Sequence, residues 1–474
     1  MAPIGLWKVH GEDPLGTNYP SWRGWCGQGS WFPSGVTQLS PVPVTRAGVR
    51  WSLGHALPST LLRRAAREGD LHGRMFVATQ SSGMEELDPI LDELRSHGTF
   101  YRGKYASVSV DNAAVRALLS SPDAGSGFVP SDGTGFLGRL QAWSLRDAPL
   151  GPLTPPSLLV TEPPDHTRYR KLVSRVFSVR AVERLRGRTR QIADRLLDGL
   201  DPSDPVDLVS AYCSLLPVTV IAEILGVPEA DREKVLRFGA AAAPSLDLGL
   251  SWREFRRVES ALREFDEWLA GHLESLRRHP GDDLLSQLVA AQEDGVGLSD
   301  TELKSTAGLV LAAGFETTVN LLGNGIALLA GDPEQRRQLA EREALWPNAV
   351  DEVLRIDPPV LLTGRLTTAD TEVSGVPVRR GAVMVGMLAG ANRDPQVFPD
   401  PDRFDVTRDN ARDHVSFSAG RHYCLGAALA RMEGEVGLRT VFERFPDLRL
   451  EPGAVRRSTR ILRGYERLPV TPDP

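Results

Sequence analysis

One cysteine of the chain, Cys424, lies in a loop whose composition suits a reactive thiolate. The loop reads Phe417-Ser-Ala-Gly420-Arg-His422-Tyr-Cys424-Leu-Gly426, and good helix formers follow it directly. The positive end of a helix dipole favours a thiolate at this position. Gly420 and Gly426 let backbone N–H groups approach the sulfur, and Phe417 can pack against a flat macrocycle. Composition alone predicts roughly 0.001 occurrences of this pattern of Phe, Gly and Cys, so the pattern is specific.

A second feature is an acid and an alcohol inside a long apolar helix. The pattern Ser299-Asp-Thr-Glu302 predicts a capping box, and we expect a proline-free helix from Asp300 to Ala330. At 1.5 Å per residue this helix is roughly 46 Å long and must cross the core. Glu316 and Thr317 lie near its centre, where polar groups are costly to bury unless they have partners or a task. A local kink or bulge at this point could hold water or dioxygen.

Two further pairs of charged residues have helical spacing. Glu352 and Arg355 are three residues apart, so they can pair on one helix face. His166 and Arg170 are one turn apart and can face the same anionic group. A solvated helix face is the simpler interpretation of either pair when it is taken alone.

These motifs together resemble those of the cytochrome P450 superfamily, over roughly residues 85–470, and in particular its soluble bacterial, actinobacterial members. The resemblance implies haem b as cofactor, with Cys424 as the axial thiolate ligand of the iron. Further haem contacts fall on His166, Arg170, Arg365, Phe417 and His422. The family pattern usually has glycine where this chain has Ser418, which we interpret as a tolerated variant of the loop.

The resemblance also assigns roles to the other motifs. Glu316 and Thr317 occupy the acid and alcohol positions that deliver protons to dioxygen. Glu352 and Arg355 match a structural pair of the family, which Arg403 is expected to join.

The implied fold is mostly α with small β-sheets, and it holds the haem between the long distal helix and the proximal helix after Cys424. The substrate pocket is expected to be apolar and to draw on three segments. Its candidate residues are Leu309, Ala312 and Ala313, then Val360, Leu361 and Leu362, and finally Ile461 and Leu462. Residues 123–160 and 238–252 are expected to form a lid.

The implied reaction inserts one oxygen atom from O2 into an apolar small molecule. The chain has no GxGxxG-type flavin or nicotinamide domain and no cluster of cysteines, so we expect electrons from a separate ferredoxin and ferredoxin reductase. Arg421 and Arg431 are candidates for the docking surface. Three alternatives keep the haem: peroxide-driven oxygenation, a dehydration or rearrangement, and a non-catalytic haem carrier or sensor.

Composition excludes several other classes of protein. The chain of 474 residues has a net charge of −6, whereas a nucleic-acid binder is expected to carry a basic stripe. No apolar run reaches the roughly 18 residues that span a bilayer, and no signal-like segment opens the chain, so we expect a soluble, cytoplasmic protein. Three scattered cysteines argue against a disulfide framework.

The motifs are expected to belong to one domain over residues 85–474. Residues 44–84 form an N-terminal helical element, and residues 1–43 are either an irregular extension or precede a true start near Val44. One strand is expected over residues 99–110, a second strand region over residues 365–386, and a long irregular loop over residues 123–160.

Overall fold

The computed structural model describes residues 44–80, 86–126, 135–174, 177–201, 204–281, 283–293 and 296–472. They belong to one compact unit that begins at Ser40. The expected irregular extension, residues 1–43, lies outside the described residues. Within the described part the chain is mostly helical with small sheets, as expected.

The helices before the long one are α1 (Val44–Trp51), α2 (Leu57–Arg67), α3 (Leu71–Ala78), α4 (Asp88–Ser96), α5 (Asn112–Ser120), α6 (Gly135–Leu145), α7 (Asp165–Ser174), α8 (Val179–Glu183), α9 (Arg186–Asp198), α10 (Leu215–Ile224), α11 (Arg232–Ala242), α12 (Trp252–Arg278) and α13 (Leu284–Ala290). The remaining helices are α14 (Asp300–Gly331), α15 (Pro333–Glu341), α16 (Trp346–Ile356), α17 (Leu388–Ala391) and α18 (Ala427–Arg444).

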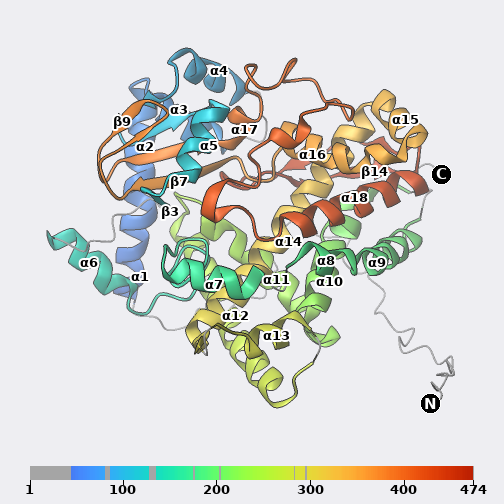
Figure 1. The fold of residues 1–474 in the computed structure, drawn as a ribbon, viewed down its shortest axis with the longest axis horizontal. Coiled ribbons are helices and arrows are strands. Elements are labelled where there is room, and N and C mark those ends of the chain that lie inside the picture. Colours follow the sequence, from blue (N-terminus) through green and yellow to red (C-terminus); the bar gives the residue numbers. More distant parts are fainter. Residues whose placement is uncertain are drawn as a thin grey trace, which may run out of the picture. The chain divides into compact units, whose positions relative to one another are not determined.

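The largest sheet of the described residues has the strand order β1-β2-β10-β7-β3. Its strands are β1 (Tyr101–Arg102), β2 (Ser107–Ser109), β3 (Ala124–Ser126), β7 (Leu362–Thr367) and β10 (Val383–Met387). Short ribbons add β4 (Val206–Asp207), β5 (Gln292–Glu293), β6 (Val296–Gly297), β8 (Thr371–Val373), β9 (Val376–Val378), β11 (Arg449–Leu450), β12 (Val455–Arg456), β13 (Tyr465–Arg467) and β14 (Pro469–Thr471). In Figure 1 the large sheet and helices α2 to α5 occupy one side, while α8 to α13 gather on the other.

Two expectations about these segments need correction. Residues 123–160 are not one irregular loop, because they contain β3 and α6. Residues 99–110 are not one strand but the short antiparallel pair β1 and β2, since the chain turns between Arg102 and Ser107. The density of Gly, Ser and Pro in the first segment hid a helix of eleven residues.

Helix α14 starts and ends where local signals place it. The Ser299 side chain accepts from the Glu302 N–H, and the Glu302 side chain accepts in return from the Ser299 N–H, so the capping box is present. The helix stops at Gly331, one residue beyond the predicted end, because Asp332 and Pro333 begin the next helix. At 32 residues it is the longest helix of the described part of the chain.

Helix α18 packs closely on α14 through glycines. A Cβ on Gly437 would lie 2.7 Å from Leu322, and one on Gly325 would lie 2.7 Å from Leu438. Real Cβ atoms essentially never come this close, so a side chain at either position would require the facing leucine to move. The contact fixes α18, which follows the Cys424 loop, against the helix that carries Glu316.

Helix α1 ties two other parts of the fold together. Arg50 lies 2.5 Å from the buried carboxylate of Glu259 on α12 and 3.1 Å from Asp147, which follows α6. Trp51 Nε1 donates to the Leu250 carbonyl at 2.8 Å. Helix α1 therefore bridges α6 and the start of α12, the two segments expected to form the lid.

Candidate functional site

The Cys424 loop is held in shape by one unusual residue and one glycine. Ser418 has φ +63°, a left-handed conformation in which glycine is favoured. Its hydroxyl is buried without a hydrogen-bond partner. At Gly420 a Cβ would lie 2.6 Å from the Leu119 carbonyl oxygen, so only glycine fits. The Cys424 N–H closes the loop by donating to the Phe417 carbonyl at 2.8 Å.

The Cys424 side chain is accessible and yet removed from bulk water. Its residue surface is accessible to a water-sized probe, yet burial raises the pKa of the thiol, as it does for groups removed from bulk water. A hydrogen bond from the Gly426 N–H and the charges of Arg170 and Arg431 act the other way and favour the thiolate. The two observations agree if the thiol opens onto a cavity inside the fold.

Helix α14 also carries accessible residues near its centre. Ala313 is exposed and Thr317 partly exposed, although most of the neighbouring residues on the helix are buried. They are four residues apart and share one face. The contact of α14 with α18 lies further along both helices, so Thr317 and Cys424 both precede it. We infer that their accessible side chains face each other across the wedge between the two helices.

Three of the residues predicted to contact haem are partly or fully removed from water, and two of them carry a buried nitrogen without a protein partner. His166 is 3% exposed with no partner for Nε2, and Arg365 is 3% exposed with none for Nε. Burial lowers the pKa of His166 to about 4 and that of Arg365 to about 10. Burial also lowers the pKa of Arg170, and the charge of Cys424 opposes that effect. Arg365 is therefore a buried cation, which requires an anion, and an anion beside His166 would favour its protonated form.

His422 brings these groups to one place, and it reveals a residue that the sequence did not single out. Its ring lies 4.5 Å from the ring of His166. Its Nε2 lies 3.2 Å from Glu162, whose other oxygen lies 2.8 Å from Arg421. Burial alone would raise the pKa of Glu162, but the bonds from His422 and the Ser126 N–H lower it. The only sequence signal was the place of Glu162 just before the two prolines that precede α7.

Phe417 and the two candidate docking arginines, Arg421 and Arg431, all have partners among the described residues. The Arg431 guanidinium lies 4.5 Å from the Phe417 ring centroid and 2.7 Å from Asp351. Arg421 pairs with Glu162. Both side chains stay partly exposed, at 24% for Arg421 and 23% for Arg431, and their place in a docking surface stays a prediction.

Glu316 points away from Thr317 in this structure. It is 2% exposed, and one oxygen lies 2.5 Å from Nη1 of Arg457. Thr317 donates its hydroxyl to the Ala313 carbonyl at 2.8 Å, and Thr318 bonds in the same way to Gly314. The predicted kink is not present as a break, because α14 stays helical throughout.

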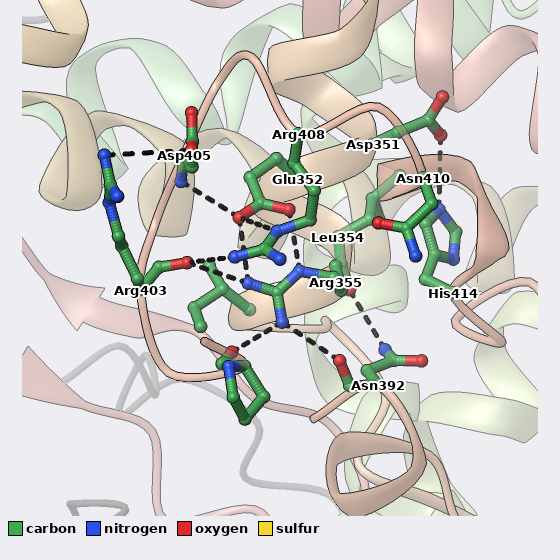
Figure 2. A network of polar contacts seen from close by, with 12 residues as sticks. Asp351, Glu352, Leu354, Arg355, Asn392, Arg403, Asp405, Arg408, Asn410 and His414 are labelled. Carbon is green, nitrogen blue, oxygen red and sulfur yellow. Dashed lines mark hydrogen bonds and ion pairs between the residues drawn. The ribbon is translucent and has the colours of Figure 1, made fainter. Parts of the chain in front are cut away.

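The structural cluster contains Glu352 and Arg355, as expected, but its third member is a different arginine (Figure 2). Arg355 Nε lies 2.7 Å from Glu352, and both side chains have no exposed surface. Arg408 Nε donates to Glu352 at 3.2 Å. The Arg403 side chain is 63% exposed and lies 3.8 Å from Asp405, so the assignment of Arg403 is corrected to Arg408. Arg403 contributes only its carbonyl oxygen, which accepts from Arg355 and Arg408 at 3.0 Å each.

Two of the three expected pocket segments lie side by side. Val360 pairs with Leu462, and the Leu361 N–H donates to the Ile461 carbonyl at 2.8 Å. The Asp247 carboxylate accepts from the Ile461 N–H at 3.0 Å, which ties the expected lid to this pair of segments. Leu362 opens β7. The side chain of Ala312 lies outside the described residues.

Leu309 lines a small cavity of about 30 Å³. Most of the cavity wall is apolar, and it combines α11, α12, α14 and residues 150–152. Its apolar lining includes Leu150, Phe238, Leu262, Phe265 and Leu269. Segments from both expected lid regions therefore line this cavity together with α14.

Comparison with known proteins identifies this arrangement. The sequence profile of the cytochrome P450 family matches residues 241–456. Cytochrome P450 140 of Mycobacterium tuberculosis is 51% identical over 433 residues, which cover 90% of this chain and 98% of the relative. The chain belongs to the cytochrome P450 family. The vitamin D(3) 25-hydroxylase of Pseudonocardia autotrophica is 44% identical to this P450 over 329 residues, 68% of the chain and 80% of the relative.

Solved P450 structures share the fold. The ligand-free crystal structure of CYP164A2 from Mycobacterium smegmatis has a TM-score of 0.75 and 32% identity, and it covers 84% of this P450 and 99% of that chain. The structure of P450BioI with an acyl carrier protein has a TM-score of 0.74 and 30% identity, and it covers 82% of this P450 and 99% of that chain. The expected fold and family are confirmed.

P450 proteins are haem-thiolate monooxygenases, and the residues of this chain fit their cofactor. The buried His166 Nε2 and Arg365 Nε lack partners, and Cys424 is accessible from inside the fold. A dianionic macrocycle with a metal that binds thiolate would satisfy all three. No helix in the described part of the chain is long and apolar enough to cross a membrane.

Proposed function

We propose that this P450 inserts one oxygen atom of O2 into an apolar small molecule, with electrons from a ferredoxin and its reductase. The observation that supports the proposal is the occurrence of Glu316 and Thr317 side by side on the buried helix α14, in a chain that also has an accessible thiol at Cys424. A haem carrier would need the thiol but not an acid and an alcohol in the middle of a buried helix.

Haem supplies the redox and oxygen chemistry when it is bound, and Cys424 is the residue that would hold its iron. The N–H of Gly426 and the charge of Arg170 act on the same sulfur. Hydrogen bonds to a ligand sulfur reduce its electron donation and so tune the metal. His166, Arg170, Arg365 and His422 would neutralise the two propionates.

Thr317 and Glu316 move protons on the distal side. The Thr317 hydroxyl can give its proton toward the cavity and take one back from the Glu316 carboxyl, which is recharged from water. The back-bond of Thr317 to Ala313 keeps the hydroxyl beside the exposed face of α14. Glu316 must turn from Arg457 to reach Thr317, or a water must bridge them.

The apolar substrate class follows from the cavity walls. Leu309, Phe238 and Leu262 supply few hydrogen-bond partners, so binding would depend on shape and on burial of apolar surface. A volume of about 30 Å³ holds no organic substrate, so a substrate bound against Leu309 would need a larger space than this cavity.

The first test is the absorption spectrum of the reduced protein with carbon monoxide, for wild type and Cys424→Ala. We expect a far red-shifted Soret band in the wild type that the variant lacks. A Soret band at the ordinary position in well-loaded wild type would overturn the thiolate assignment.

The second test separates oxygen activation by electron transfer from the peroxide-driven alternative. Ferredoxin, reductase and NAD(P)H are supplied in one reaction and hydrogen peroxide alone in another, each with a panel of apolar small molecules. Product is expected only in the first reaction. Thr317→Ala should consume NAD(P)H but release peroxide in place of product. Product formation with peroxide alone, undiminished in Thr317→Ala, would contradict the proposal.

A further inference from the structure

Glu316 is one of three polar residues in a row on α14, and this row faces the C-terminal hairpin. Glu316, Asn320 and Asn324 are four residues apart, so they lie on one side of the helix. All three are buried, with exposed fractions of 2%, 0% and 0%. We define the C-terminal hairpin as residues 455–467, which comprise β12, β13 and the turn between them.

The hairpin contacts each member of the row. Arg457 Nη1 lies 2.5 Å from Glu316. A Cβ on Gly464 would lie 2.0 Å from the Asn320 side-chain oxygen, so the hairpin backbone presses directly on this amide. Arg456 donates to Asn324 at 2.8 Å and pairs with Asp357 at 2.7 Å.

Arg457 is itself held by the hairpin. Its N–H donates to the Gly464 carbonyl at 3.0 Å, and its Nε donates to the Tyr465 carbonyl at 3.2 Å. Two of its groups are therefore fixed by backbone, and Nη1 is directed at Glu316. Its side chain is 17% exposed, so the pair lies between the core and the surface.

We infer that Arg457 is a positioning residue, which orients Glu316 toward the hairpin side of α14 and so controls when this acid can serve Thr317. The inference rests on the proposed function and adds a residue to it. Arg457 and Glu316 form an ion pair, but neither Glu316 oxygen has a partner with hydrogen-bond geometry. A pair of this kind orients the acid but leaves it able to turn.

The row also marks how a proton can reach Glu316. The two side-chain polar atoms of Asn320 have no protein partner, like the two oxygens of Glu316. Buried polar atoms are nearly always satisfied, and water does so where protein does not. These four unpartnered atoms belong to residues one helical turn apart on the row, where we expect water to supply a proton to Glu316.

Other titratable groups near this part of α14 are engaged elsewhere. Burial raises the pKa of Glu316, and the charge of Arg457 is the one opposing influence identified among the described residues. Glu433 on α18 bonds to Thr318, and Tyr212 donates to the Gly437 carbonyl at 2.8 Å. Tyr465 on β13 lies against Gly323 rather than Glu316.

The test measures the ionisation of Glu316 directly in the ferric haem-loaded protein. Infrared difference spectra between pH values report its carboxylic acid band, which Glu316→Gln identifies by removing it. We expect Arg457→Met to raise the midpoint of this band by about one pH unit or more, as loss of a close opposite charge does. Arg457→Lys should restore most of the shift.

Arg456→Met is the matched control, since it removes a second tie between hairpin and α14 without touching Glu316. Its midpoint should equal that of the wild type. An unchanged midpoint in Arg457→Met, or an equal shift in Arg456→Met, would overturn the inference.

A reciprocal measurement covers the case in which Arg457→Met does not take up haem. In Glu316→Gln, modification of arginines by phenylglyoxal, followed by peptide mass spectrometry, should proceed several-fold faster at Arg457 than in the wild type. The rate at Arg456 should stay the same. Equal rates at Arg457 in both proteins would refute the pairing. The carbon monoxide spectrum of the same samples reports separately whether the proposed function holds.

Discussion

Arg408 and Arg403 give a matched pair of substitutions that tests the corrected core cluster. Arg408→Met removes one partner of the fully buried Glu352. It also removes the donors at 2.6 Å from the Pro399 carbonyl and at 3.0 Å from the Asp400 carbonyl. Loss of one partner from a buried ion pair costs about 3–5 kcal/mol. Because Arg355 still neutralises Glu352, we expect about 3 kcal/mol.

Arg403→Met is the control. Its side chain is 63% exposed and lies 3.8 Å from Asp405, and exposed ion pairs contribute about 0–1 kcal/mol. Its carbonyl, which the cluster does use, is unaffected by the substitution. We therefore expect a loss below about 0.5 kcal/mol.

The assay is urea unfolding of the haem-loaded proteins, followed by far-ultraviolet circular dichroism and by the Soret band. Coincident transitions would justify a two-state free energy. If Arg403→Met lost as much stability as Arg408→Met, or Arg408→Met lost less than about 1 kcal/mol, the cluster as described would be wrong.

Three further outcomes are expected. Ser418→Gly should raise the free energy of unfolding by about 1 kcal/mol, because it relieves the left-handed φ of +63° and removes an unpartnered hydroxyl. Ser374, at φ +48°, is exposed, so Ser374→Gly should give a smaller gain in the same urea experiment. Gly420→Ala should lower haem content and the red-shifted carbon monoxide band, since its Cβ would meet the Leu119 carbonyl at 2.6 Å, and normal loading would contradict that steric reading. Burial raises the pKa of Asp247 from 3.8 to about 6, so its contribution to stability is present below pH 3.8 and is lost as pH rises through about 6. The stability difference between wild type and Asp247→Asn should therefore fall by on the order of 2 kcal/mol from pH 4 to pH 7, and a constant difference would refute the assignment.

Features fixed by local sequence were predictable, and those fixed by long-range packing were not. The capping box at Ser299, the end of α14 and the Glu352–Arg355 pair all depend on residues within one or two turns. The choice between Arg403 and Arg408 depends on how an irregular segment folds back on α16, which no local pattern encodes. Glu162 was missed for the same reason, because its partners lie about 260 residues away.

The left-handed residue in the Cys424 loop was visible only in part. Ser418 stands where the family usually has glycine, and the sequence alone indicated only a variant of the loop. The structure shows that Ser418 keeps the left-handed conformation that a glycine would adopt. The backbone requirement is therefore kept, and the chain accepts the associated strain.

The close contact of α14 with α18 bears on how this enzyme could be re-engineered. With Gly325 and Gly437 at the crossing, a larger residue at either position meets a leucine of the other helix. A library that varies these glycines would therefore mainly disturb the packing of α14 on α18. Phe238 and Leu262 line a cavity, so variation there changes its shape without altering this crossing.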